Sequence, residues 1–200
     1  MIAEAQTEVV IKEKAKILFF QKGVLNATTQ EIADEAGVNR ALIHYYFRSR
    51  EHLMDLLLEE IVTAKKNRKR AILLAEVPFR QKIANYIEDA LEQGLQYPYL
   101  ENFIITETAR NPEKVNLFCF KDKLRSSELI KDQLEAEIRK GALPPISAEH
   151  FMVNLVSMCN YPLLAKNVIR NVHGMSDSTY HQFLLERKEV ILKTLFTNPH

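Results

Sequence analysis

The stretch from Thr28 to Leu53 reads TTQEIADEAGVNRALIHYYFRSREHL and carries the clearest local signals in this 200-residue chain. Thr28 and Glu31 have the capping-box spacing, in which each side chain satisfies a free backbone N–H of the other residue, so a helix is expected to begin here. Gly37 can adopt the positive φ that ends a helix, and Asn39 is a good N-cap for the next one. The stretch therefore predicts two short helices joined by a glycine turn, which is the pattern of a helix-turn-helix.

A helical pattern before this stretch completes a three-helix unit, and a pattern after it predicts a further, longer helix. Apolar residues recur at helical spacing before it and end at Gly23, which predicts a first helix packed across the other two. After it, Ser49 caps a longer helix that is expected to run to about Arg70. That helix ends in the basic run KKNRKR at residues 65–70. The run is either a second nucleic-acid patch or, as we favour, a solvated helix end.

A wider set of residues between Ala15 and Leu53 extends the pattern. It comprises Ile17, Leu18, Phe19, Phe20, Gly23, Thr28, Thr29, Ile32, Ala33, Ala36, Gly37, Val38, Tyr45, Tyr46, Phe47, Ser49, Glu51 and Leu53. This set resembles the N-terminal domain of the TetR family of transcriptional regulators. The resemblance implies a sequence-specific, DNA-binding repressor. It also implies that a small-molecule ligand, bound in the C-terminal domain, releases the protein from its operator.

The solvent-facing side of the second helix is the expected reading surface. Arg40 lies in its first turn, where the guanidinium can meet the O6 and N7 atoms of guanine, and Ala41 and Leu42 can touch a thymine methyl. His44 can donate to a base or a phosphate, whereas Tyr45 is either part of this surface or a core aromatic. The resemblance implies backbone contacts at Thr28, Thr29, Tyr46 and Arg50 and a base contact at Gln30. The predicted DNA-binding residues are Thr28, Thr29, Gln30, Asn39, Arg40, Ala41, Leu42, His44, Tyr45, Tyr46 and Arg50.

The rest of the chain predicts further helices, each bounded by Pro or Gly. They are expected at about 78–97, 98–110, 112–140 (continuous or broken once), 147–172 and 176–196. No segment alternates convincingly as a strand, so the predicted fold is all-α. We expect an N-terminal helix-turn-helix DNA-binding domain at residues 1–53 and a larger helical ligand-binding and dimerisation domain at residues 54–200.

The last two predicted helices are apolar around much of their circumference. A helix that is apolar on all sides must be buried on all sides. The two are either a core helix with a terminal helix laid on it, or they also face a second subunit. A helix-turn-helix ordinarily works as a two-fold dimer, which favours a homodimer through these helices. Charged residues at Leu163 or Ile191 are expected to break it.

The larger body is expected to hold a ligand cavity or a plain aromatic core. Glu107 and Asn154 fall in line with apolar residues at helical spacing, and a carboxylate on an apolar face is costly unless it is paired. Glu107 either pairs with Arg110 or Arg125 or awaits a cationic ligand. The candidate cavity residues are Leu57, Ile61, Phe103, Glu107, Phe118, Asn154 and Met158.

Composition is that of an ordinary globular protein, with 46% apolar and 26% charged residues. The net charge of +1 argues against a protein that coats nucleic acid through bulk positive charge. Charge is placed locally instead, since residues 36–50 contain Arg40, Arg48 and Arg50 and no acidic residue. No apolar run reaches the roughly 20 residues of a membrane span, so we expect a cytoplasmic protein. Cys119 and Cys159 are then buried thiols.

Motifs of catalysis and cofactor binding are missing from the sequence. It contains no Gly-rich phosphate loop, G-x-S-x-G, H-E-x-x-H or paired C-x-x-C, so neither an enzyme nor a cofactor is expected. His173 and His181 flank a turn but lack the cysteines or carboxylates of a metal site, so no metal is expected. The alternative to a DNA-binding regulator is a small helical ligand carrier or enzyme with no DNA role.

Overall fold

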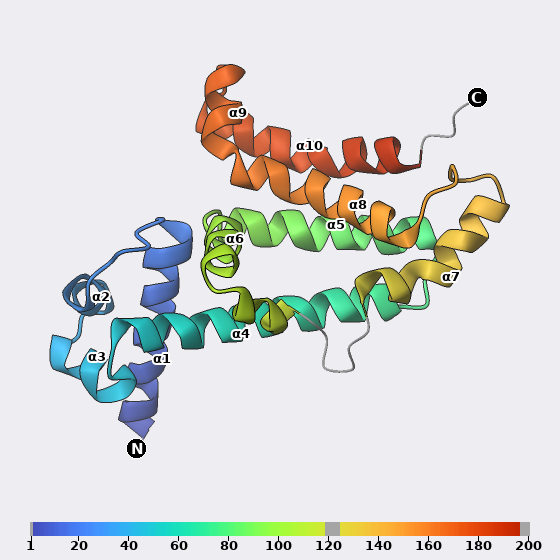
Figure 1. The fold of residues 1–200 in the computed structure, drawn as a ribbon. Coiled ribbons are helices and arrows are strands. Elements are labelled where there is room, and N and C mark those ends of the chain that lie inside the picture. The colour runs from blue at the N-terminus through green and yellow to red at the C-terminus, as the bar shows by residue number, and fades with distance from the viewer. Residues whose placement is uncertain (1, 119–124, 197–200) are drawn as a thin grey trace. The chain divides into compact units, whose positions relative to one another are not determined.

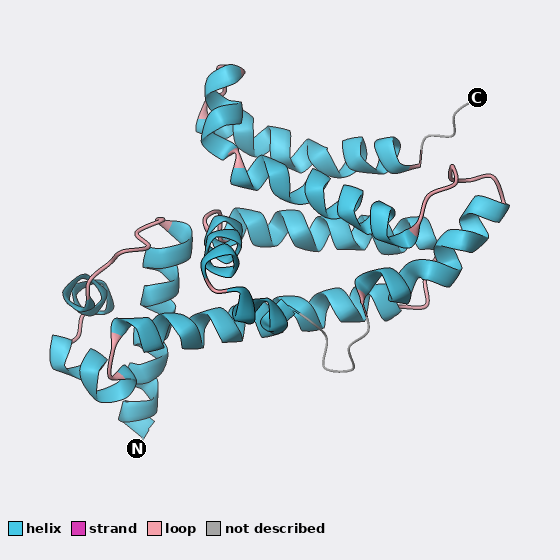
Figure 2. Cartoon of the chain, viewed as in Figure 1, coloured by secondary structure: helices cyan, strands magenta, loops and turns pink. Residues whose placement is uncertain are grey.

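The fold is helical throughout the part of the chain that the structure describes (Figure 1). The structure is a computed structural model; it describes residues 2–118 and 125–196, with side chains for residues 6–115 and 125–196. These ranges contain ten α-helices and no strand, which confirms the predicted all-α fold (Figure 2). The α-helices are α1 (Ile2–Lys16), α2 (Thr29–Ala36), α3 (Arg40–Phe47), α4 (Arg50–Leu74), α5 (Phe79–Gln96), α6 (Leu100–Arg110), α7 (Ser126–Arg139), α8 (Ala148–Leu164), α9 (Lys166–Val172) and α10 (Asp177–Leu195). A π-helix, η1 (Ile17–Gln21), continues α1, and a 3-10 helix, η2 (Pro112–Phe118), follows α6.

The chain divides into two units. The N-terminal unit consists of residues 1–65 and 96–118, and the C-terminal unit of residues 66–95 and 119–200. This division differs from the predicted boundary at residue 53, because the first part of α4 and the whole of α6 belong with the helix-turn-helix. The assignment of DNA binding to one domain, and of ligand binding and dimerisation to the other, remains a prediction.

The predicted caps fix the ends of α2 and α3 in the N-terminal unit. The Thr28 hydroxyl accepts the Glu31 N–H at 3.2 Å, and the Glu31 carboxylate accepts the Thr28 N–H at 2.7 Å. Gly37 ends α2 with a φ of 65°, and the Asn39 side chain accepts the Ala41 N–H at 2.8 Å where α3 begins. The predicted helix-turn-helix is therefore confirmed. Its core includes the buried side chains of Ile11, Phe19, Phe20, Ile32, Ile43, Phe47, Leu53 and Leu57.

Contacts of η1 and the residues just after it with the start of α6 explain why α6 belongs to the N-terminal unit. The Phe20 carbonyl, in the π-helical turn, accepts the Tyr99 N–H at 3.1 Å. Gly23, with a φ of 74°, makes room for the Tyr99 ring, because a Cβ atom at Gly23 would lie 2.8 Å from that ring. The Phe20 and Phe103 rings pack with their centroids 5.6 Å apart. These contacts come from residues far from the helix-turn-helix in sequence.

The C-terminal unit packs α5, α7, α8 and α10 around a shared core, with α8 and α10 side by side (Figure 1). Gly94 lets α5 approach α8, because a Cβ atom there would overlap the Leu163 side chain. Lys82 is buried, and its ammonium donates to the Leu73 carbonyl at 2.6 Å. Burial lowers the pKa of Lys82. The core includes Ile83, Ile87, Phe151, Leu155 and Ile191.

The long helix predicted in this region is two helices, α8 and α9. Pro162 lies within α8 and has no N–H to donate to the Met158 carbonyl one turn earlier. That carbonyl accepts a hydrogen bond from Arg187 Nη2 of α10 at 3.2 Å. The Pro162 carbonyl accepts the Tyr180 hydroxyl, also of α10, at 2.6 Å. The irregular end of α8 is therefore bonded to α10.

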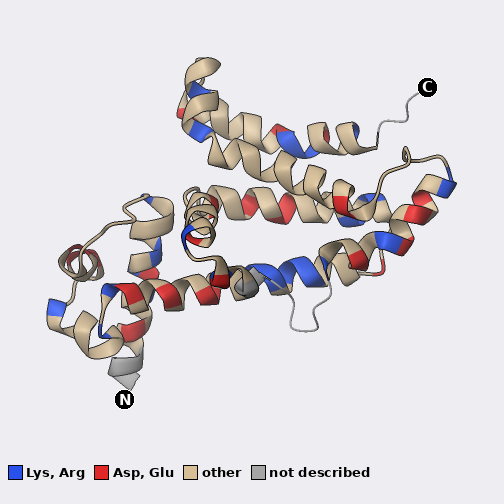
Figure 3. Ribbon diagram, viewed as in Figure 1, with Lys and Arg blue, Asp and Glu red and all other residues tan. Residues whose placement is uncertain are grey.

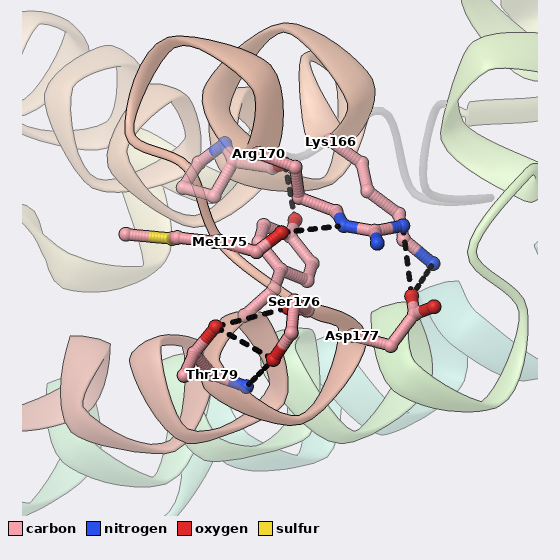
Figure 4. Close-up of polar contacts among 8 residues, drawn as sticks. Lys166, Arg170, Met175, Ser176, Asp177 and Thr179 are labelled. Carbon is pink, nitrogen blue, oxygen red and sulfur yellow. Dashed lines mark hydrogen bonds and ion pairs between the residues drawn. The ribbon is translucent and has the colours of Figure 1, made fainter.

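Polar contacts hold the turn between α9 and α10 (Figure 4). Arg170 Nη1 lies 2.8 Å from Asp177 Oδ1, and Arg170 Nε donates to the Met175 carbonyl at 3.4 Å. The Ser176 hydroxyl accepts the Thr179 N–H at 3.1 Å and so caps α10. The first turn of α10 is thereby tied to α9.

Candidate nucleic-acid interface

One face of α3 is exposed and the opposite face is buried. Arg40, Ala41 and His44 are exposed, and the Tyr45 side chain has 70% of its surface accessible. Ile43 and Phe47 are buried in the core of the N-terminal unit, and Leu42 is half-buried. The interpretation of Tyr45 as a core aromatic is therefore wrong. The exposed face contains the types of side chain that read base edges in a major groove.

Arg40 and Thr29 join the first turns of α3 and α2. Arg40 Nε donates to Thr29 Oγ1 at 3.0 Å. This bond uses one edge of the guanidinium, because Arg presents five N–H donors in a fixed fork. The structure thus brings together two predicted DNA-binding residues, one from each helix of the motif.

The other predicted residues of α2 are exposed but have partners within the protein. The Thr28 side chain belongs to the capping box with Glu31. Gln30 Nε2 donates to Asp34 Oδ1 at 2.7 Å, one turn along the same helix. Both side chains can still face DNA, because the Gln30 amide has a second N–H and an oxygen besides the N–H that bonds Asp34.

Tyr46 lies at the border between the exposed face and the core. Its side chain is half-buried. Its ring centroid is 5.0 Å from that of Tyr45 in an edge-on arrangement and 6.1 Å from that of Phe47. The Tyr46 ring thus packs at the edge of the unit, whereas the Phe47 side chain lies in its core.

Arg50 does not have the environment expected of a residue that contacts DNA phosphates. Its Nε donates to the Ala27 carbonyl at 2.7 Å, and its Nη2 donates to the Leu25 carbonyl. The guanidinium carbon also lies 5.6 Å from the centroid of the Phe19 ring. Arg50 therefore holds the segment that precedes α2 against the start of α4. The sequence contains no signal for this role, because backbone carbonyls look alike in every sequence.

Arg48 also lies near this surface, although the predicted DNA-binding residues do not include it. Its side chain is exposed at the residue that ends α3. Its backbone has a φ of 62°, which is unusual for a residue other than glycine. The signal in the sequence was that residues 36–50 contain three arginines and no acidic residue.

Figure 3 shows how the basic and acidic residues are distributed over the helices.

The basic run in α4 is engaged with groups of the protein itself. Lys65 forms an ion pair with Glu101 in the N-terminal unit. In the C-terminal unit, Arg68 Nε lies 3.0 Å from Asp89 Oδ1, and Lys69 Nζ lies 4.8 Å from the centroid of the Tyr86 ring. The favoured expectation of a solvated helix end is therefore wrong, because α4 continues to Leu74 and most of the run is half-buried. The same contacts also disfavour a second nucleic-acid patch.

The predicted ligand-binding residues occupy three different environments. Leu57 and Ile61 are buried in the core of the N-terminal unit. Phe103 and Glu107 line a pocket in that unit, whereas Asn154 and Met158 line a pocket of about 340 Å³ in the C-terminal unit. The Phe118 side chain lies outside the described residues. The predicted residues therefore divide between two separate pockets and a core.

Glu107 has a partner, but not one of the arginines that the sequence suggested. Its Oε1 lies 2.7 Å from Lys114 Nζ and accepts from Asn111 Nδ2 at 2.8 Å. The expectation that Glu107 pairs with Arg110 or Arg125 is wrong. The reason is that η2 follows α6 directly and brings Lys114 back towards the carboxylate.

The sequence also raised the questions of a metal site, of the two cysteines and of a membrane span. No group of three or more His, Cys, Asp or Glu residues in these ranges is placed to hold a metal ion. Cys159 is buried, and burial raises the pKa of its thiol to about 11, whereas Cys119 lies outside the described residues. No helix in the described ranges is long and apolar enough to cross a membrane.

Comparisons with known proteins match both the motif and the whole chain. A family model described as bacterial regulatory proteins, tetR family, matches residues 11–57, which contain α2 and α3. The chain is 25% identical over 201 residues to YttP, a probable HTH-type transcriptional regulator of Bacillus subtilis (strain 168), and the match covers 96% of this chain and 95% of YttP. It is 23% identical over 152 residues to the nucleoid occlusion factor SlmA of Mannheimia succiniciproducens, with 72% of this chain and 67% of SlmA covered.

Solved structures share the fold. A mutant of the HlyIIR protein with a linker in place of one segment has a TM-score of 0.60 and 22% identity, with 98% of both chains covered. PfmR from Thermus thermophilus, a TetR family transcriptional regulator, has a TM-score of 0.55 and 16% identity, with 92% of this chain and 94% of PfmR covered. At these identities the likeness concerns the fold alone.

Proposed function

Because this chain belongs to the tetR family of bacterial regulatory proteins, we propose that it regulates transcription by binding an operator with α3 in the DNA major groove. The observation that carries the proposal is the exposed face of α3, which presents Arg40, His44 and Tyr45 opposite a buried face, with the exposed Arg48 directly after the helix. No acidic residue lies in α3 or in the turn before it, so DNA phosphates meet no like charge there.

Arg40 is the proposed base-reading residue. It lies in the first turn of α3, the end that enters the groove in this motif. Its bond to Thr29 fixes one edge of the guanidinium, so the fork can be presented to guanine with less loss of side-chain entropy. His44, further along α3, and Arg48, at the residue that ends it, are proposed to contact phosphates or base edges.

Dimerisation is proposed to use α8 and α10. Both helices bear large apolar side chains that are exposed in the single chain, and such side chains are expected at an interface. On α8 these are Val153 and Tyr161, and on α10 they are Leu185 and Val190. A two-fold dimer would place two reading heads on two half-sites, as the motif ordinarily requires.

The two positions first expected to test the dimer are unsuitable. Leu163 has only 5% of its surface accessible and lies between α5 and α10, and Ile191 is fully buried in the core of the C-terminal unit. A charge at either position would unfold the unit, because a buried unpaired charge is costly. Tyr161 and Leu185 are the better test positions.

Repression relieved by a small ligand is the proposed mode of regulation. The family resemblance motivates it, and the two pockets give it candidate sites. A ligand that favours a conformation unable to reach both half-sites by about 1 to 3 kcal/mol weakens operator binding by about 5- to 150-fold.

In vitro selection from a random duplex library would test the proposed function. The protein is expected to enrich a palindromic sequence and to bind it far more tightly than unselected duplex of equal length. Arg40→Ala should prefer the selected duplex over the unselected one by a smaller factor than the wild-type protein does. Binding of the wild-type protein to every duplex with the same affinity would show that the chain is not a sequence-specific regulator.

A further inference from the structure

A pocket of about 600 Å³ lies within the N-terminal unit, beside the helix-turn-helix. The start of α4 contributes Met54 and Asp55, and the side of α6 contributes Tyr99, Phe103 and Glu107. Lys114 of η2 also lines the pocket. Every residue that lines the pocket belongs to this one unit, so the pocket does not depend on the C-terminal unit.

A single ammonium group sits between two carboxylates of this pocket. Lys114 Nζ lies 2.8 Å from Asp55 Oδ1 and 2.7 Å from Glu107 Oε1. The hydrogen bonds to Asp55 and Glu107 raise the pKa of Lys114, so the charged form is favoured there. The three groups together hold one more negative than positive charge, and the geometry of the two carboxylates accepts an ammonium ion.

The other charged residues of the pocket have partners or positions unlike those of Lys114, Asp55 and Glu107. Arg50 donates to two backbone carbonyls, and Glu51 lies beside Arg50. Arg110 is exposed at the end of α6. An anionic ligand would therefore have to rely on Arg110, or on Lys114, whose single charge the two carboxylates already outweigh.

Apolar and aromatic side chains lie next to the two carboxylates. Phe103 precedes Glu107 by one turn on α6, and Met54 adjoins Asp55 on α4, so each carboxylate has an apolar neighbour on the pocket wall. Tyr99 adds a second ring to the wall. Rings beside carboxylates suit a ligand that combines a positive charge with an apolar body.

We propose that this pocket binds an organic ammonium ligand with an apolar ring, whose cationic group displaces the Lys114 ammonium from Asp55 and Glu107. Occupation of the pocket changes operator affinity. The reason is that Arg50, which lines the same pocket, also holds the carbonyls of Leu25 and Ala27 immediately before α2. The ligand thus acts inside the unit that carries the reading helix, and this regulatory half of the proposal rests on the proposed function.

The test uses phenethylamine as the cationic probe and 3-phenylpropionate, of similar shape and opposite charge, as its control. Protein labelled with ¹³C at the methionine methyl groups gives one signal for each of its five methionines. Met54 lines the pocket, whereas Met158 lines the pocket of the other unit and serves as the internal reference. Phenethylamine is expected to shift the Met54 signal in a saturable way and 3-phenylpropionate to leave it unchanged.

Three variants distinguish the proposed geometry from general attraction. Glu107→Gln and Asp55→Asn should each weaken phenethylamine binding by up to about fivefold, the upper range for a partly exposed ion pair. Lys114→Ala should strengthen it, because the competing internal ammonium is gone. As a control, Glu59→Gln, an exposed carboxylate one turn after Asp55 and outside the pocket, should change nothing. Thermal unfolding of each variant checks that it is folded.

Several results would overturn the proposal. Weaker phenethylamine binding by Lys114→Ala would show that the amine does not compete with the Lys114 ammonium, and tighter binding of 3-phenylpropionate than of the amine would mean that the pocket selects anions. An unchanged operator affinity at saturating amine would remove the regulatory half. Failure of the unliganded protein to select an operator would refute the proposed function instead, while the Met54 signal would still decide whether the pocket binds an ammonium ligand.

Discussion

Arg50, the first residue of α4, donates from Nε to the carbonyl of Ala27, 2.7 Å away, just before α2 begins. Together with the bond from Nη2 to the Leu25 carbonyl, this contact ties α4 to the segment that positions the helix-turn-helix. The residue resembles a phosphate-binding position in sequence, yet its donors are directed at the protein's own backbone.

Arg50→Ala is expected to destabilise the N-terminal unit by about 1 to 3 kcal/mol, because two carbonyls lose a charged donor. Operator binding should weaken through loss of positioning, with little change in its salt dependence. Arg48→Ala is the matched control: its stability should be unchanged, while the slope of log affinity against log salt should fall by about one. Denaturation and filter binding at several salt concentrations measure both quantities. A reduced salt slope for Arg50→Ala with unchanged stability would restore Arg50 as a phosphate contact.

Arg40→Ala is expected to weaken specific binding by about 1 to 3 kcal/mol and to relax the preference at one base pair. Affinity for unselected duplex should fall much less, because base contacts carry the sequence information. Arg139→Ala, an exposed arginine at the end of α7, serves as a control for the loss of one positive charge. Titration of operators with single substitutions locates the base pair. Equal losses on all duplexes would assign Arg40 to the phosphates.

Tyr161→Glu and Leu185→Glu are expected to give folded monomers, because both side chains are exposed in the single chain and charges there would be buried only in a dimer. Leu163→Glu, in contrast, should be poorly folded. Sedimentation velocity combined with circular dichroism separates the two effects. A wild-type protein that sediments as a monomer at micromolar concentration would contradict the proposed homodimer.

Gly94→Ala is expected to destabilise the C-terminal unit by about 1 to 3 kcal/mol, because the added methyl overlaps the Leu163 side chain. Leu163→Ala alone leaves a cavity and should also destabilise. The double variant should lose less than the sum of the two, because each change relieves the other. Denaturant unfolding of the four proteins gives the coupling, and strictly additive losses would show that the two sites do not touch.

Cys159 is expected to resist thiol reagents at pH 8 in the folded protein and to react once it is unfolded, because burial raises the pKa of its thiol to about 11. The reaction is measured in a protein that carries Cys119→Ser, so that only Cys159 can react. The unfolded thiol ionises near pH 9 and the folded one does not, so this stabilising contribution is full below pH 9 and falls as the pH rises towards 11. The loss should reach about 2 to 3 kcal/mol. Cys159→Ala should lack this part of the pH dependence; an identical dependence in both proteins would contradict the shift.

The helix-turn-helix could be predicted because its determinants are local. The capping box, the left-handed glycine and the second N-cap each involve residues within four positions of one another. The roles of Arg50 and Glu107 could not be predicted in this way. Their partners depend on which carbonyl or ammonium group the fold brings near, and the sequence suggested Arg110 or Arg125 for a carboxylate that pairs with Lys114.

The boundary between the two units could not be predicted for the same reason. A boundary at residue 53 follows the end of the recognisable motif, whereas the packing of Phe20 against Phe103 joins residues more than eighty positions apart. Pairings over such separations leave no periodic pattern in the chain. The exposed apolar residues of α8 and α10 were visible as wide stripes, but which of them face outward was decided by the core around Ile191.

The hydrogen bond from the Tyr99 N–H to the Phe20 carbonyl allows hydrogen–deuterium exchange to follow the contact between η1 and α6. Tyr99 precedes the first turn of α6, so its amide has no partner within that helix and owes its protection to the π-helical end of α1. Its deuterium uptake therefore measures how often α6 separates from the end of α1, without any label or mutation. Neighbouring amides further along α6 would remain protected by their own helix during the same opening.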